Sequence, residues 1–133
     1  MNRNGFRSWL ELYGTAWKTR DPKLIKNLFA EGAKYYEKPF ESPISGIESI
    51  MEYWSVIAQT QQNIKFDYDI LDVDKNQGIA HWSASFIRKL TQTQVNLDGI
   101  FVVNADSDNK CIIFREWWHS SKTNPARTNK HAL

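Results

Sequence analysis

The chain has 133 residues, of which 41% are hydrophobic and 14% aromatic, a composition typical of one packed globular domain. Seventeen basic and fifteen acidic residues leave a formal charge of +2, which is too balanced for a surface dedicated to nucleic acid. Because no apolar run approaches about 20 residues and the amino terminus lacks a signal-peptide core, we expect a soluble, cytoplasmic protein with no membrane partner. The single cysteine, Cys111, excludes an intrachain disulfide, and we expect it to be a small buried hydrophobe.

The first half of the chain carries helical patterns. The first predicted helix has an apolar face at the i, i+3, i+4 and i+7 positions, formed by Phe6, Trp9, Leu10, Tyr13 and Trp17. Asp21 followed by Pro22 predicts the start of a second, short helix, which we expect to end at Glu31-Gly32. Ser45 followed three residues later by Glu48 matches a capping box and predicts a third helix that ends near residue 61.

Strand patterns dominate the second half. A brief strand is predicted over residues 34–37, followed by a loop over 40–46. Four longer strands are predicted over residues 64–73, 79–89, 94–104 and 110–120, joined by polar turns. Three helices followed by a run of antiparallel strands predict a single α+β domain over residues 1–120, and residues 121–133 form a polar, basic tail.

The strand predicted over residues 110–120 places a carboxylate in an apolar row. Side chains alternate along a strand, so one face is predicted to carry Ile112, Phe114, Glu116 and Trp118. A carboxylate in such a row must find a partner, take up a proton or face a wet cavity. We interpret Glu116 as part of a pocket wall; the alternative is an ion pair with a cation such as Arg88 or Lys34.

The order of these elements resembles the nuclear-transport-factor-2-like superfamily, which includes SnoaL-like polyketide cyclases and ketosteroid isomerases. The resemblance spans residues 6–120 and rests on Tyr13 before Asp21, the run 28–33, the Ser45-Gly46 helix entry and the closing run 114–118. It implies a cone-shaped, cystatin-like barrel in which a curved antiparallel sheet wraps around the three helices. It also implies a small, largely apolar ligand between the sheet and the helices, and dimers that form through the opposite sheet face.

The similarity to the ketosteroid isomerases implies three catalytic positions. Tyr13 matches their tyrosine hydrogen-bond donor, and Glu37 matches their carboxylate general base. Their third residue, a protonated acid, falls near Asp98, but an ungapped count from Phe86 places Gly99 there. Asp98 therefore points inward only if the preceding turn is one residue shorter. The alternatives are that Tyr13 is a core tyrosine, Glu37 a solvated loop residue and Asp98 structural.

The same comparison implies which side chains line the cavity and which face outward. The sheet residues implied to line it are Trp82, Ala84, Phe86, Phe114, Glu116 and Trp118, and the other aromatic candidates are Trp17, Tyr36 and Trp54. The alternative for these rings is ordinary core packing. The side chains implied to face outward are His81, Ser83, Ser85, Arg115, Trp117 and His119. Because these include a large apolar surface, we expect a homodimer through this face.

Two functions remain open. The first is a cofactor-free isomerase, cyclase or dehydratase, in which Glu37 moves a proton, Tyr13 stabilises a developing oxyanion and Glu116 assists. The second is a non-catalytic ligand-binding module or dimeric scaffold of the same fold. We expect no metal site, because three histidines and one cysteine occur at no ligand spacing.

Overall fold

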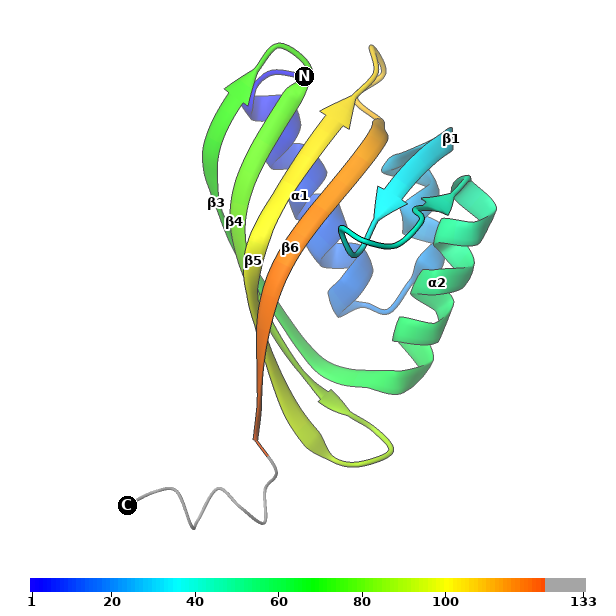
Figure 1. Ribbon diagram of the computed structural model, residues 1–133, viewed down its shortest axis with the longest axis vertical. Helices are drawn as coiled ribbons and strands as arrows, with labels where there is room; N and C mark the ends of the chain where they lie inside the picture. The colour runs from blue at the N-terminus through cyan, green and yellow to red at the C-terminus, as the bar shows by residue number, and fades with distance from the viewer. Residues whose placement is uncertain (124–133) are drawn as a thin grey trace.

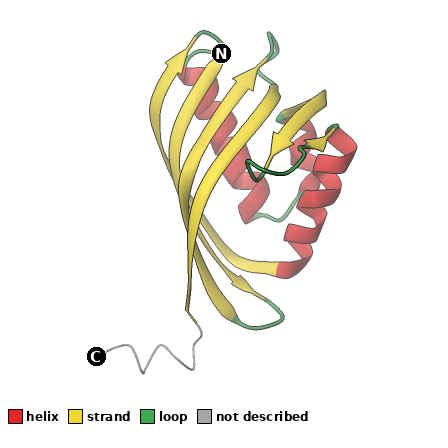
Figure 2. Ribbon diagram, in the orientation of Figure 1, coloured by secondary structure: helices red, strands yellow, loops and turns green. Residues whose placement is uncertain are grey.

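The computed structural model describes residues 1–123 as two α-helices, one 3₁₀ helix and a six-stranded sheet (Figures 1 and 2). In chain order the elements are α1 (Arg3–Lys18), η1 (Pro22–Asn27), β1 (Phe29–Tyr36), β2 (Ile44–Ser45), α2 (Ile47–Thr60), β3 (Gln61–Asp74), β4 (Gln77–Arg88), β5 (Thr93–Ala105) and β6 (Cys111–Thr123). The expected tail begins inside β6, which continues to Thr123, and its remaining residues lie outside the described part. No helix within residues 1–123 is both long and apolar enough to cross a membrane.

Helix α1 forms as its apolar pattern predicts. Asn2 caps it, because its side-chain oxygen accepts a hydrogen bond of 2.7 Å from the backbone N–H of Gly5. The predicted apolar face is buried against the sheet, including Phe6, Tyr13 and Trp17. In Figure 1, α1 lies behind the long strands as viewed, on the concave side of the sheet.

The second predicted helix is shorter than expected. Asp21 caps it as predicted, but the helix is of the 3₁₀ type and ends at Asn27. Phe29 already belongs to β1, where it pairs with Cys111, and the Cys111 N–H donates to the Leu28 carbonyl at 2.7 Å. This pairing with a residue 82 positions away in the chain overrides the local helical pattern, so the predicted helix end at Glu31-Gly32 is wrong.

The predicted capping box is also wrong. Ser45 lies in the short strand β2, where it pairs with Lys34, and its hydroxyl accepts a hydrogen bond from the Lys34 ammonium at 3.1 Å. Gly46 takes the N-cap position of α2 with a φ of +87°, a conformation that glycine adopts readily. Helix α2 still begins at Ile47 as its apolar stripe predicts.

The six strands form one mixed sheet in the order β2-β1-β6-β5-β4-β3. The four long predicted strands are confirmed, and they pair antiparallel in sequence order from β3 to β6. Strand β1, however, pairs with β6 in the parallel direction, so the sheet is not wholly antiparallel as expected. The long strands curve together, and α1 and α2 occupy the concave side (Figure 2).

A register shift at the start of β6 changes which side chains face the core. Asn104 pairs with Ile113, but the next residue of β5, Ala105, pairs with Cys111, so Ile112 has no pairing partner there. Cys111 is fully buried as expected, whereas Ile112 is 40% exposed and does not share the inner face with Phe114. The alternation that places Phe114, Glu116 and Trp118 on one face therefore begins only after this irregularity.

Gly99 makes room for the aromatic layer of the concave face. A Cβ atom at this position would overlap the Trp117 carbonyl oxygen and lie 3.0 Å from Nε1 of Trp82. The Trp82 ring stacks on Phe101 with a centroid distance of 4.8 Å, next to the rings of α1. Only a residue without a side chain lets Trp82 lie this close to the backbone of β5 and β6.

Candidate functional site

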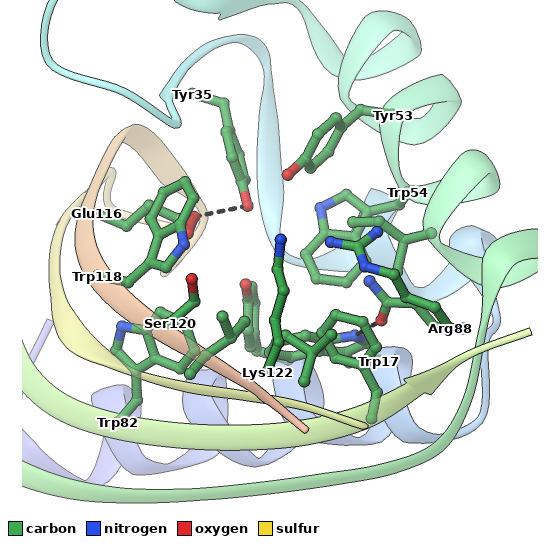
Figure 3. Close-up of a pocket in the computed structure, with 16 residues that line it drawn as sticks. Trp17, Tyr35, Tyr53, Trp54, Trp82, Arg88, Glu116, Trp118, Ser120 and Lys122 are labelled. Carbon is green, nitrogen blue, oxygen red and sulfur yellow. Dashed lines mark hydrogen bonds between the residues drawn. The ribbon is translucent and has the colours of Figure 1, made fainter. Parts of the chain in front are cut away.

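A cavity of about 200 Å³ lies between the concave face of the sheet and the two α-helices (Figure 3). We call it the inner cavity. Its lining residues are Tyr13, Trp17, Tyr35, Tyr53, Trp54, Ile57, Gln61, Trp82, Phe86, Arg88, Val95, Leu97, Glu116, Trp118, Ser120 and Lys122. The hollow is therefore not filled by the aromatic side chains that surround it.

Glu116 lines the inner cavity and is only 8% exposed. One carboxyl oxygen, Oε2, accepts a hydrogen bond of 2.9 Å from the Tyr35 hydroxyl (Figure 3). The pKa of Glu116 is raised to about 8, mainly by burial; the hydrogen bond from Tyr35 acts against this rise, and the charge of Glu37 adds to it. Glu116 forms no salt bridge with Arg88 or Lys34 within the described residues, so the ion-pair alternative does not hold there.

Three tyrosines surround this carboxyl group. Tyr13 from α1, Tyr35 from β1 and Tyr53 from α2 all line the inner cavity. Burial, and next the charge of Glu116, raise the pKa of each of these phenols above its ordinary value. All three hydroxyls therefore stay protonated around neutral pH, where they can donate hydrogen bonds.

Glu37 follows the end of β1 and is half-buried. It does not line the inner cavity, but it lines a more open depression of about 650 Å³, which we call the outer groove. The residues of the outer groove are Glu37, Lys38, Pro39, Asp98, Gly99, Ile100, Glu116, Trp117, Trp118 and His119. Because β1 pairs with β6 only as far as Arg115, β6 has a free edge from Glu116 onward, and the groove lies along this edge. Glu116 and Trp118 belong to both spaces.

Asp98 faces away from the inner cavity. It pairs across the sheet with Ser83 and His119, and its carboxylate lies 3.0 Å from Nε2 of His81 on the convex face. The ungapped count was correct, since Gly99 takes the inward position and lies beside Trp82. A catalytic role for Asp98 within the inner cavity is therefore ruled out by its position in the strand.

The aromatic candidates divide into cavity and core. Trp17, Trp54, Trp82, Phe86 and Trp118 line the inner cavity as expected. Two others do not line it. Phe114 is fully buried in the packed core, stacked on Tyr35 at 4.5 Å, and Tyr36 points away from the cavity because its neighbour Tyr35 points inward. Ala84, also expected to line it, is buried without reaching the cavity.

Six polar residues that line the inner cavity were not among the residues predicted to line it: Tyr35, Tyr53, Gln61, Arg88, Ser120 and Lys122. The signal for Tyr53 was available, because it lies within α2 next to Trp54 and one helical turn from Ile57. Arg88 and Lys122 stand at strand ends, where charged residues are usually solvated. Figure 3 shows the Lys122 side chain directed into the cavity, with its amino end toward Tyr53 and Trp54.

The polar groups of the inner cavity include a carboxyl group and several hydrogen-bond donors. Over residues 1–123, no three histidine, cysteine or acidic side chains gather closely enough to hold a metal ion. The inner cavity instead combines one titratable carboxyl group, three phenolic donors and an aromatic wall. Such an arrangement can exchange a proton with a bound molecule and hydrogen-bond an oxygen atom on it.

Comparison with known proteins identifies the family and the fold of this chain. The model of the SnoaL-like domain matches residues 9–112. Solved structures match over most of their length. One is a Bacillus subtilis protein, with a TM-score of 0.76, 16% identity and 90% of each chain covered. Another is the epoxide hydrolase/cyclase-like enzyme SalBIII, which has a role in pyran ring formation in the polyether salinomycin; its TM-score is 0.73, with 14% identity, 85% of this chain and 89% of that chain covered. An NTF2-like protein of unknown function from Exiguobacterium sp. 255-15 also matches (TM-score 0.69, 15% identity, 84% of this chain and 98% of that chain). No curated protein sequence matches the chain.

Proposed function

Since this chain belongs to the SnoaL-like family, we propose that it is a cofactor-free enzyme that moves a proton within a small, largely apolar carbonyl compound, as an isomerase, cyclase or dehydratase does. The observation that carries the proposal is the buried carboxyl group of Glu116. Its pKa of about 8 keeps it mostly protonated at neutral pH, and it lines a cavity large enough for a small molecule. A carboxylic acid with a pKa near the working pH is suited to acid–base catalysis.

In this proposal Glu116 is the hydrogen-bonding acid and Glu37 is the base. Tyr35 donates to Oε2 of Glu116, which leaves the other oxygen of the protonated acid to donate to a substrate carbonyl oxygen. Glu37 lines the outer groove, where Glu116 and Trp118 form the boundary with the inner cavity. A substrate at this boundary has the acid on one side and Glu37 on the other. Glu37 then removes a proton from the carbon next to the carbonyl group and returns it to another atom.

In this arrangement Tyr13 has a positioning role. It is 2% exposed, and its ring packs against both Trp9 and Phe114, which also contact each other. The buried phenol lies near Tyr35, whose hydroxyl holds the acid, so we propose that Tyr13 keeps Tyr35 in place. Its direct contact with a substrate oxygen, which the family resemblance implies, is the less favoured reading because so little of Tyr13 is accessible.

The proposal is tested by hydrogen exchange, which does not require the natural substrate. The protein is incubated in D₂O with 1-indanone, 2-tetralone and phenylacetone, and deuterium at the carbon next to the carbonyl group is followed by NMR. We expect exchange above the buffer rate, reduced by a factor of about 10² to 10⁴ in Glu37→Gln. Glu41→Gln is the matched control, because Glu41 is exposed on the following loop. Buffer-rate exchange with all three ketones, or full exchange in Glu37→Gln, would reject the proposal.

A non-catalytic binding module remains the second candidate. It is favoured by the position of Glu37, which reaches the outer groove but not the inner cavity. A molecule confined to the inner cavity would contact only one carboxyl group, that of Glu116. Ligand binding that leaves Glu37→Gln unaffected, without deuterium exchange, would favour this function over the enzyme.

We also propose that two copies pair through the convex face of the sheet. Trp117 is 44% exposed on this face and Ile113 is 37% exposed, next to Ile100 and Val102 on β5. Exposed apolar side chains gathered in this way are typical of an interface. Light scattering of the wild-type protein is expected to give the mass of a dimer, and Trp117→Lys the mass of a monomer. A wild-type monomer would reject this pairing.

A further inference from the structure

The polar groups at the entrance of the inner cavity are almost all hydrogen-bond donors. Two cations, Arg88 at the end of β4 and Lys122 at the end of β6, line the cavity and are exposed at its entrance. Within residues 1–123 neither forms a salt bridge. The Arg88 guanidinium carbon lies 5.7 Å from the centroid of the Phe86 ring, and Figure 3 shows the side chain of Lys122 directed into the cavity.

Buried neutral donors add to these two charges. Trp54 is 4% exposed, and its Nε1–H is buried without a hydrogen-bond partner among the described residues. A buried unpaired N–H costs free energy, about 1 to 3 kcal/mol, unless a ligand or water accepts from it. Gln61, also buried, uses its carbonyl oxygen to accept from Nε1 of Trp17 at 2.8 Å, so its amide N–H₂ is the group left for a ligand.

Acceptors and negative charges are scarce in the same space. Among residues 1–123, Glu116 is the only acidic residue that lines the cavity, and it lies toward the Tyr35 end. Because burial raises the pKa of Glu116 to about 8, this group is mostly neutral at pH 7. The cavity therefore carries two positive charges at its entrance and little negative charge to balance them.

We propose that the inner cavity takes an organic anion, a small aromatic or apolar molecule with a carboxylate group. The carboxylate lies at the entrance between Arg88 and Lys122 and accepts from the Trp54 indole N–H. The apolar body lies against the rings of Trp17 and Phe86, and the far end reaches Glu116. This assignment of a ligand class rests on the proposed function, because it places the reacting end of the molecule at the acid.

The test compares two ligands of the same shape and different charge. The probes are 3-benzoylpropanoate, an aryl keto acid, and its primary amide, and binding is measured by isothermal titration calorimetry at pH 7. Exposed charge pairs contribute about 0.2 to 1 kcal/mol each, so for the two cations together we expect the acid to bind roughly twofold to thirtyfold more tightly than the amide. This preference should shrink between about 20 mM and about 500 mM NaCl, because salt screens exposed charges.

Variants locate the origin of the preference. Arg88→Met with Lys122→Met should bring the two probes to nearly equal affinity, whereas Lys65→Met, which removes an exposed cation from the convex face, should leave the preference unchanged. Equal binding of the two probes to the wild-type protein, binding of neither, or a preference that survives in the double variant would overturn the anionic class.

The same measurement separates this inference from the proposed function. Binding is read without turnover, and Glu37→Gln is expected to keep the preference for the acid, since Glu37 does not line the inner cavity. A protein that prefers the acid but exchanges no deuterium would reject only the enzyme. A protein that exchanges deuterium but binds both probes equally would reject only the anionic class.

Discussion

Replacing Glu116 by Gln should remove most of the pH dependence of folding stability between pH 5 and 8.5. The folded state holds the Glu116 proton with a pKa of about 8, against an ordinary value of 4.5. Because this pKa is raised in the folded state, the proton stabilises the fold below pH 4.5, and this contribution is lost as the pH rises to 8. Glutamine keeps the shape of the side chain and cannot ionise.

The magnitude follows from the same two values. One pKa unit corresponds to 1.36 kcal/mol, so ionising Glu116 inside the folded protein costs about 5 kcal/mol in full. Between pH 5 and 8.5 most of this cost is incurred. We expect the free energy of unfolding of the wild-type protein to fall by roughly 4 kcal/mol more than that of Glu116→Gln over this range.

The assay is urea unfolding followed by tryptophan fluorescence at pH 5, 6.5 and 8.5. Glu41→Gln, on an exposed loop, is the control and should follow the wild-type protein at each pH. Other titrating groups are common to all three proteins, so the difference between wild type and variant isolates Glu116. Parallel pH curves for the wild-type protein and Glu116→Gln would refute a buried, protonated acid and, with it, the acid–base site.

Three further predictions follow from single contacts. Tyr35→Phe removes the hydrogen bond that lowers the pKa of Glu116, so ¹³C NMR of the labelled carboxyl should show this pKa rise; an unchanged titration would contradict the 2.9 Å contact. Gly99→Ala places a Cβ atom against the Trp117 carbonyl oxygen of β6, and we expect the free energy of unfolding in urea to fall by about 1 to 3 kcal/mol; wild-type stability would contradict this. Asp98→Asn removes the main cause of the raised pKa of His81, so ¹⁵N NMR should show that the pKa of His81 falls. An unchanged pKa would contradict the 3.0 Å contact between the two side chains.

The alternation of the long strands made the inner face predictable. Trp82 and Phe86 on β4 and Trp118 on β6 point inward because a strand with one packed face has a fixed register. The same rule placed Gly99, rather than Asp98, on the inner side. Glu116 could be identified as a site residue because burying a carboxylate in an apolar row costs free energy unless it is hydrogen-bonded, paired with a cation or protonated.

What the sequence did not reveal depends on contacts between distant segments. The choice between Tyr35 and Tyr36 depends on the pairing of β1 with β6, and the four residues predicted as a strand, 34–37, carry too little alternation to fix which side chain points inward. The parallel direction of that pairing likewise has no local signal. Arg88 and Lys122 resemble ordinary solvated side chains, and only the curvature of the sheet brings both to one entrance.

The hydrogen bond between Tyr35 and Glu116 joins positions 81 residues apart in the chain. Bringing such distant positions together carries an entropic cost that increases with the length of the loop, and contacts of this kind slow folding. The acid therefore gains its elevated proton affinity only after β6, the last strand described, has docked beside β1. In refolding experiments, proton uptake by Glu116 should be among the last events, and during synthesis the site can form only after β6 has left the ribosome.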